Sequence, residues 1–158
     1  MQLSRLSNDP GIIIIDNFIS TDLCNLIINN YKKKVTKKSM TAGFRSNHRT
    51  SSSHTLERNC PEMEEITINL SSQLFSDINF FEKPQIHKYE ENQEYHEHYD
   101  ARDLSKIDDT NFNQRRNTAI IYLNDNFLGG CTYFNHKRIR ITPKKGRLLL
   151  FENCFKGT

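Results

Sequence analysis

The second half of the chain carries a succession of short apolar segments separated by tight turns, and this pattern limits the fold more than any other feature. The segments of strand length are Gln85–Tyr89, Thr118–Leu123, Thr132–Phe134, Ile139–Ile141 and Arg147–Phe151. Gly129-Gly130 and Pro143-Lys-Lys-Gly146 lie between the later ones, and glycine and proline at such points are typical of turns. Segments this short and closely spaced predict antiparallel strands in a sandwich or barrel.

The first half predicts helices and one buried strand. Gly11–Asp16 contains four consecutive isoleucines between polar flanks, which is typical of a buried strand. Ser20 can cap a helix with Asp22 in its first turn, and Pro61 suits the first position of a second helix. We therefore expect an α+β fold in a single domain spanning 1–158, with a helical support region at 1–80 and a strand-rich core at 81–158.

Composition excludes several classes of protein. The net charge is only +3, and the one basic run, Lys32–Lys38, is interpreted as a solvated loop, so no nucleic-acid partner is expected. The longest apolar run is Ile12–Ile15, and no signal peptide is evident, which predicts a cytoplasmic protein without a membrane partner. The scattered cysteines predict neither a zinc site nor a disulfide framework. Abundant isoleucine, lysine and asparagine fit an AT-rich viral or microbial coding sequence, and the oligomeric state is left open.

The densest group of chemically active side chains lies between Tyr89 and Asp100. On an extended segment, residues i and i+2 point to the same side, so His98 and Asp100 converge, whereas His96 points to the other face. One imidazole and one carboxylate are two of the three ligands in a 2-His-1-carboxylate iron site. The alternative is a polar turn that happens to be rich in histidine.

A series of short motifs runs along nearly the whole chain. They are Ile14-Ile-Asp-Asn-Phe-Ile-Ser20, Arg49-Thr-Ser51, Tyr89, Tyr95-x-x-His98-Tyr-Asp100, Arg116-x-Thr118, Tyr122-Leu-Asn-Asp125, Gly129-Gly-x-Thr-x-Phe134 and Pro143-Lys-x-Gly-Arg-x-Leu-Leu-Phe-x-Asn153. In these motifs and in their order, the chain resembles the prolyl 4-hydroxylase type of Fe(II)- and 2-oxoglutarate-dependent dioxygenases. Each motif is common, and their joint order is specific.

The resemblance implies a double-stranded β-helix, which is jelly-roll-like, with supporting N-terminal helices. It implies hydroxylation of a peptidyl proline, with Fe(II), 2-oxoglutarate as cosubstrate, L-ascorbate as reductant, and succinate and CO2 as co-products. His98 and Asp100 would bind the iron, and Tyr89 and Thr132 the 2-oxoglutarate. A proline-containing peptide would contact the side chains of Tyr95, Arg116 and Arg49.

Each of these roles has a simpler alternative. Tyr89 could be a core tyrosine at a strand end, and Tyr95 could merely neighbour the metal segment. Arg116 could be a surface arginine beside Arg115, and Arg49 could cap a loop.

The family pattern breaks near the end of the sequence. The second histidine ligand, and then the Lys or Arg that pairs with 2-oxoglutarate, follow the segment ending at Asn153 in the family, and neither appears before Thr158. His136 matches a variable turn and is not expected to replace the ligand, while Cys131 stands where the family usually has glutamate. We therefore expect a C-terminally incomplete copy that lacks its last strands and is not active by itself. The alternatives are an inactive fragment or a non-catalytic peptide-binding module.

Overall fold

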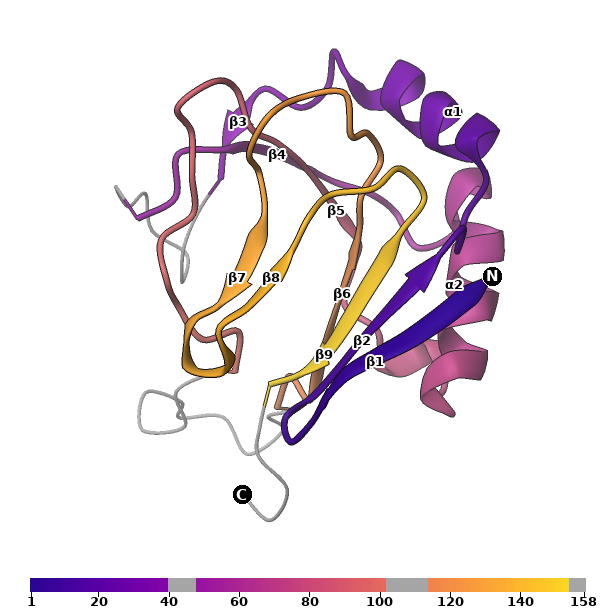
Figure 1. Ribbon diagram of the computed structural model, residues 1–158. Coiled ribbons are helices and arrows are strands. Elements are labelled where there is room, and N and C mark those ends of the chain that lie inside the picture. The colour runs from indigo at the N-terminus through magenta and orange to yellow at the C-terminus, as the bar shows by residue number, and fades with distance from the viewer. Residues whose placement is uncertain (40–47, 102–113, 154–158) are drawn as a thin grey trace, which may run out of the picture. The chain divides into compact units, whose positions relative to one another are not determined.

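The computed structural model describes residues 1–39, 48–101 and 114–153 (Figure 1). The chain divides into two compact units. One unit comprises Met1–Thr21 with Glu97–Thr158, and the other comprises Asp22–His96. The segment between Ala101 and Gln114, whose polar and charged composition predicts a loop, falls almost wholly outside the described residues. We describe the units one at a time.

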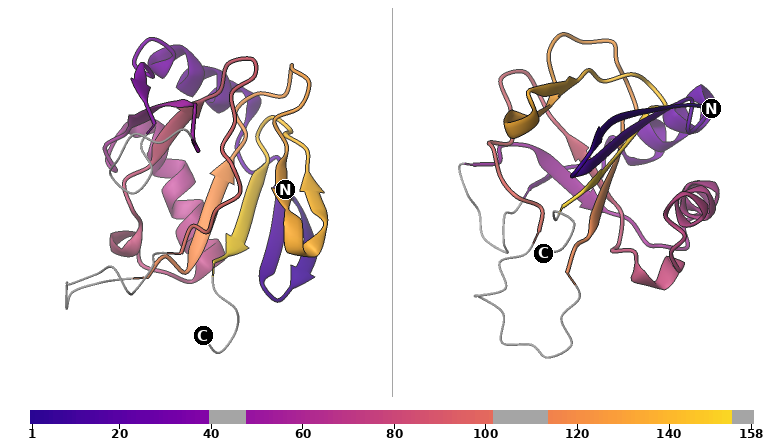
Figure 2. Two further views of the ribbon diagram at one scale, coloured as in Figure 1. Left: turned by 90° about the vertical axis from the view of Figure 1, so that its left-hand side faces the viewer. Right: turned by 60° about the horizontal axis from the view of Figure 1, so that its bottom comes forward.

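The first unit is built on a four-stranded antiparallel sheet with the strand order β1-β2-β9-β6. Its strands are β1 (Gln2–Asn8), β2 (Gly11–Asp16), β6 (Asn117–Ile121) and β9 (Leu148–Glu152). Strand β9 lies between β2 and β6, with Ile14 and Ile120 both opposite Leu149. Figure 2 shows the β1–β2 hairpin beside β9 from two further directions. Ile12 and Ile15 are buried and Ile13 and Ile14 are partly buried, in a strand that lies in the interior of the sheet rather than at its edge.

A second layer of the same unit is the two-stranded ribbon of β7 (Thr132–Phe134) and β8 (Ile139–Ile141), which the 3-10 turn η3 (Asn135–Lys137) connects. Ile141 of the ribbon forms one buried cluster with Ile12 and Leu149 of the sheet. The rings of Phe134 and Phe151 meet edge to face with 5.0 Å between their centroids. Apolar side chains thus hold the ribbon against one face of the sheet.

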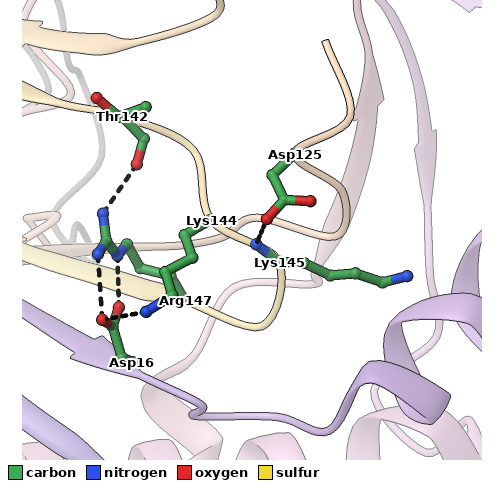
Figure 3. Close-up of polar contacts among 6 residues, drawn as sticks. All are labelled: Asp16, Asp125, Thr142, Lys144, Lys145 and Arg147. Carbon is green, nitrogen blue, oxygen red and sulfur yellow. Dashed lines mark hydrogen bonds and ion pairs between the residues drawn. The ribbon is translucent and has the colours of Figure 1, made fainter.

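An ion-pair cluster joins the end of β2 to the turn that precedes β9 (Figure 3). The Asp16 carboxylate accepts hydrogen bonds from Arg147 Nε at 2.6 Å and from Lys144 Nζ at 2.8 Å. Arg147 also donates to the carbonyl of Thr142 at 2.9 Å. Because the hydrogen bonds from Arg147 and Lys144 outweigh the effect of burial, they lower the pKa of Asp16 from 3.8 to about 2.

The turn itself requires glycine at position 146. Gly146 has a φ of +76°, and a Cβ atom there would collide with the carbonyl oxygen of Ile19. The Gly146 carbonyl accepts the N–H of Phe18 at 2.8 Å, and its own N–H donates to the carbonyl of Tyr122 at 2.8 Å. The backbone therefore approaches too closely for any side chain.

The second unit combines two helices with a three-stranded antiparallel sheet of order β3-β4-β5. Its elements are α1 (Thr21–Tyr31), β3 (Lys37–Lys38), β4 (Ser52–Thr55), α2 (Pro61–Leu74), the 3-10 turn η1 (Ile78–Phe80) and β5 (Gln85–Lys88). Cys24, Ile27 and Ile66 are among its buried side chains. Helix α1 contacts α2 where Asn30 Nδ2 donates to Glu62 Oε1 at 2.6 Å.

Among the described residues, the structure consists mainly of strands with two α-helices, which agrees with the expected α+β class. The strands expected at Gly11–Asp16, Thr132–Phe134 and Ile139–Ile141 have those bounds, and the second helix begins at Pro61 as expected. Strand β1 was not expected. Within the described ranges, neither α-helix is both long and apolar enough to cross a bilayer.

Candidate functional site

His98 and Asp100 lie together in the first unit, as their spacing predicts. They occupy an irregular segment rather than a regular strand. The Nε2 atom of His98 is 3.1 Å from Oδ1 of Asp100, and their side chains are 33% and 23% exposed. A small ion could therefore reach both atoms from solvent.

The second carboxylate oxygen of Asp100 accepts a hydrogen bond from a side chain of strand β6. Thr118 Oγ1 is 2.7 Å from Asp100 Oδ2. Asn153, just beyond β9, is in turn 3.0 Å from Thr118 Oγ1 through its Nδ2 atom. The carboxylate is thus connected to two adjacent strands of the central sheet.

The environment of Asp100 keeps this carboxyl ionised. Burial alone would raise its pKa, but hydrogen bonds from His98 and Thr118, with the charges of His98 and Arg115, outweigh burial and lower the pKa. A negatively charged oxygen beside an imidazole nitrogen is a donor pair suited to a divalent cation.

The residues next to the His98–Asp100 pair contact the β7–β8 ribbon. Glu97 accepts a hydrogen bond from Asn135 Nδ2 at 3.2 Å. The Tyr99 hydroxyl lies 3.5 Å from Nε2 of His136. His136 therefore contacts Tyr99 from the turn between β7 and β8.

The separation of the two donor atoms fits a metal centre. Ligands about 2.1 Å from one ion and about 90° apart lie about 3.0 Å from each other. The 3.1 Å between His98 Nε2 and Asp100 Oδ1 matches that value. Across the described ranges, however, no third His, Cys, Asp or Glu completes a group of three that could hold a metal ion.

Thr132, expected to bind the cosubstrate, is hydrogen-bonded to Tyr122, for which no role was expected. Its hydroxyl is 2.7 Å from the phenolic oxygen of Tyr122, which contacts the buried cluster of the first unit. Burial raises the pKa of Tyr122, and the Thr132 hydrogen bond opposes this only in part. Tyr122 belongs to the Tyr122-Leu-Asn-Asp125 motif, but no local feature of the sequence indicates its hydrogen bond.

Arg49 and Tyr95, both expected at the peptide-binding surface, meet in the second unit. They form an antiparallel backbone bridge, and the Arg49 guanidinium lies 4.4 Å from the centre of the Tyr95 ring. Thr50 N donates to the carbonyl of Glu94 at 3.0 Å, which joins the same two segments. Arg49 Nε also donates to Ser51 at 3.2 Å. The attraction between a planar cation and an aromatic ring holds both groups in place and forms a flat surface.

The remaining expected residues are accessible to solvent. Tyr89, directly after β5, is 43% exposed, so it is not a core tyrosine. Arg116 is exposed directly before β6, and its carbonyl accepts the N–H of Asn153 at 2.8 Å. His96 pairs with Glu94, with 3.1 Å between Nε2 and Oε1.

Comparison with known sequences gives a consistent assignment. The sequence model of the 2OG-Fe(II) oxygenase superfamily matches residues 84–156, which include the His98–Asp100 pair. A protein of Acanthamoeba polyphaga mimivirus assigned as a prolyl 4-hydroxylase is 30% identical over 142 residues, or 87% of this chain. Prolyl 4-hydroxylase 5 of Arabidopsis thaliana is 28% identical and covers 94% of this chain. The chain spans 59% of the length of each of these two relatives.

A solved structure is similar over most of the chain. It is the viral collagen prolyl hydroxylase of Paramecium bursaria Chlorella virus-1 in its 2OG complex. The TM-score is 0.69 at 26% identity, and the match covers 89% of this chain and 77% of the viral one.

Proposed function

Because residues 84–156 match the 2OG-Fe(II) oxygenase superfamily and the chain is similar to prolyl 4-hydroxylases, we propose that it belongs to this superfamily and that the whole protein hydroxylates a peptidyl proline. It uses Fe(II) and 2-oxoglutarate, releases succinate and CO2, and takes L-ascorbate as reductant. Its fold is a double-stranded β-helix in a single domain. The observation that carries the proposal is the 3.1 Å His98–Asp100 pair within the residues that match the superfamily.

His98 and Asp100 are the metal ligands of this chain. Iron and 2-oxoglutarate, when bound, supply the oxidising chemistry that introduces an oxygen atom at a C–H bond. The residues of the chain bind and orient the ion, the cosubstrate and the peptide. His98 Nε2 and Asp100 Oδ1 would hold the ion, and further ligands and the cosubstrate would complete its coordination. Among the described residues, no further His, Cys, Asp or Glu joins this pair to form a group of three.

Tyr89 and Thr132 bind the cosubstrate, each through a hydroxyl group. The hydrogen bond between Thr132 and Tyr122 supports this role because it holds the threonine hydroxyl in a largely apolar setting. A hydrogen bond to the carboxylate of 2-oxoglutarate is stronger where water is excluded.

Arg49, Tyr95 and Arg116 receive the peptide. An extended proline-rich segment in the polyproline II form suits a flat aromatic and cationic surface, because it binds without a large loss of conformational entropy. The stacked Arg49–Tyr95 pair supports this role.

Turnover by the protein expressed from its complete reading frame tests the proposal. The protein is incubated with Fe(II), 2-oxoglutarate, ascorbate and a proline-rich peptide, and succinate and the gain of one oxygen atom by the peptide are measured. We expect both products from the unaltered protein and neither from His98→Ala. His96→Ala is the matched control and should retain both, since His96 pairs with Glu94.

Two results would contradict the proposal. Unchanged turnover in His98→Ala would remove His98 from the metal site. Peptide binding that ignores iron and 2-oxoglutarate, without succinate formation, would instead indicate a non-catalytic binding module.

A further inference from the structure

Thr118 is the described side chain that connects the Asp100 carboxylate to the central sheet. It lies on β6, directly opposite Phe151 of β9. Asn153 follows Phe151 by two residues, so strand alternation directs both to the same face. The Asn153 backbone N–H donates to the Arg116 carbonyl at 2.8 Å, which fixes Asn153 against the start of β6. The threonine and asparagine side chains therefore meet on a rigid part of the unit.

The single proton of the Thr118 hydroxyl sets the direction of this hydrogen-bonded chain. Two acceptors lie near it: Asp100 Oδ2 at 2.7 Å and Asn153 Oδ1 at 3.2 Å. An ionised carboxylate at the shorter distance is the stronger acceptor, so the proton points to Asp100. The Thr118 oxygen then accepts from Asn153 Nδ2 at 3.0 Å. Asn153 thus orients Thr118, and Thr118 orients Asp100.

This arrangement leaves Asp100 one oxygen for a metal. Oδ2 is engaged by the hydroxyl, whereas Oδ1 faces His98 Nε2 at 3.1 Å. A carboxylate free to turn could bind an ion through both oxygens and occupy a position that the cosubstrate needs. We propose that the Thr118 hydroxyl, held by Asn153, is a positioning group that presents Asp100 to the metal as a one-oxygen ligand. The inference rests on the proposed function.

Metal affinity tests this role without reference to turnover. Mn(II) serves as the probe, and its binding to the 158-residue chain is followed by calorimetry and by the loss of the free-ion paramagnetic resonance signal. We expect Thr118→Val to weaken Mn(II) binding about 10- to 100-fold, the range typical of an outer hydrogen-bond partner. Thr118→Ser keeps the hydroxyl and should bind within about threefold of the unaltered chain. Thr142→Val, a change at an exposed threonine of the same unit, is the matched control and should change nothing.

Asn153→Ala separates positioning from a general loss of structure. Because Asn153 acts through Thr118, its replacement should weaken Mn(II) binding in the unaltered chain and have no further effect in Thr118→Val. If Asn153 contributed only to the stability of the fold, Asn153→Ala would weaken Mn(II) binding both in the unaltered chain and in Thr118→Val. If Thr118→Val does not fold, Asn153→Ala alone decides, and unchanged affinity would overturn the inference.

The outcomes distinguish this inference from the proposed function. A folded chain that binds no Mn(II) contradicts the metal site itself, and the positioning role falls with it. A chain that binds Mn(II) equally well as Thr118→Val leaves the metal site standing and overturns the role of Thr118. Weak binding by Thr118→Ser would overturn it as well, since the hydroxyl would then be immaterial.

Discussion

Replacing Asp16 with asparagine should destabilise the first unit through the loss of one charge. The carboxylate accepts two hydrogen bonds from Arg147, at 2.6 and 3.2 Å, and one from Lys144 at 2.8 Å. The side chains of Asp16 and Arg147 are each 15% exposed. Asparagine keeps the shape of the side chain but leaves the guanidinium without its counter-charge.

The lowered pKa of Asp16 gives the magnitude of the expected loss of stability. The fall in the pKa of Asp16 from 3.8 to about 2 is due first to the Arg147 hydrogen bond and then to that from Lys144. A difference of that size corresponds to about 2.5 kcal/mol. The Lys144 side chain is 49% exposed, so solvent screens part of this interaction. We therefore expect Asp16→Asn to lower the free energy of unfolding by about 1–2 kcal/mol at neutral pH.

Urea unfolding at several pH values measures this effect and its sign. The folded-state pKa is below the unfolded-state value, so the stabilisation is present above about pH 4 and disappears as the pH falls to about 2. The difference between the unaltered chain and Asp16→Asn should be full at pH 7 and shrink in that window. Asp125→Asn is the matched control, because Asp125 accepts only the Lys145 N–H in this cluster (Figure 3), and it should cost less than about 0.5 kcal/mol. A difference that is absent at pH 7, or independent of pH down to 2, would refute the reasoning.

Three further changes have defined outcomes. Leu149→Ala removes a side chain with 0% exposure from the buried cluster and should cost about 2–5 kcal/mol in urea unfolding, so a loss below 1 kcal/mol would contradict its place in the core. Gly146→Ala should cost more than Gly129→Ala in the same assay, since both have positive φ but only residue 146 meets the Ile19 carbonyl, and equal losses would argue against that close approach. Arg116→Ala, in the complete protein, should raise KM for the peptide far more than KM for 2-oxoglutarate, whereas equal increases in steady-state assays would indicate general misfolding.

Strong local signals account for the elements that the sequence predicted. Four consecutive isoleucines indicated β2 and a proline marked the start of α2, because each of these signals lies within a few residues. Strand β1 has no such signal. Its side chains are mostly exposed, and hydrogen bonds to β2 at the edge of the sheet define it. A polar edge strand is therefore visible only once its partner is in place.

The candidate site also has one part that the sequence predicted from a local signal and another part that it did not. The separation of two residues between His98 and Asp100 predicted their convergence, although the segment is irregular. The contacts to Asp100 and Thr118 depend on partners 18 and 35 residues apart in the chain. No spacing rule reaches that far, since Thr118 and Asn153 are brought together by the pairing of β6 with β9.

The position of β9 inside the sheet affects the order in which the chain can fold during synthesis. Gly11 and Glu152, which share a hydrogen bond, are separated by 141 residues. At about 5–20 residues per second, a ribosome needs on the order of ten seconds to synthesise the stretch between them. Throughout that time β2 has its neighbour β1 on one side only, with its isoleucines uncovered. The isoleucine strand is therefore a segment of the nascent chain that needs protection from aggregation until β9 emerges.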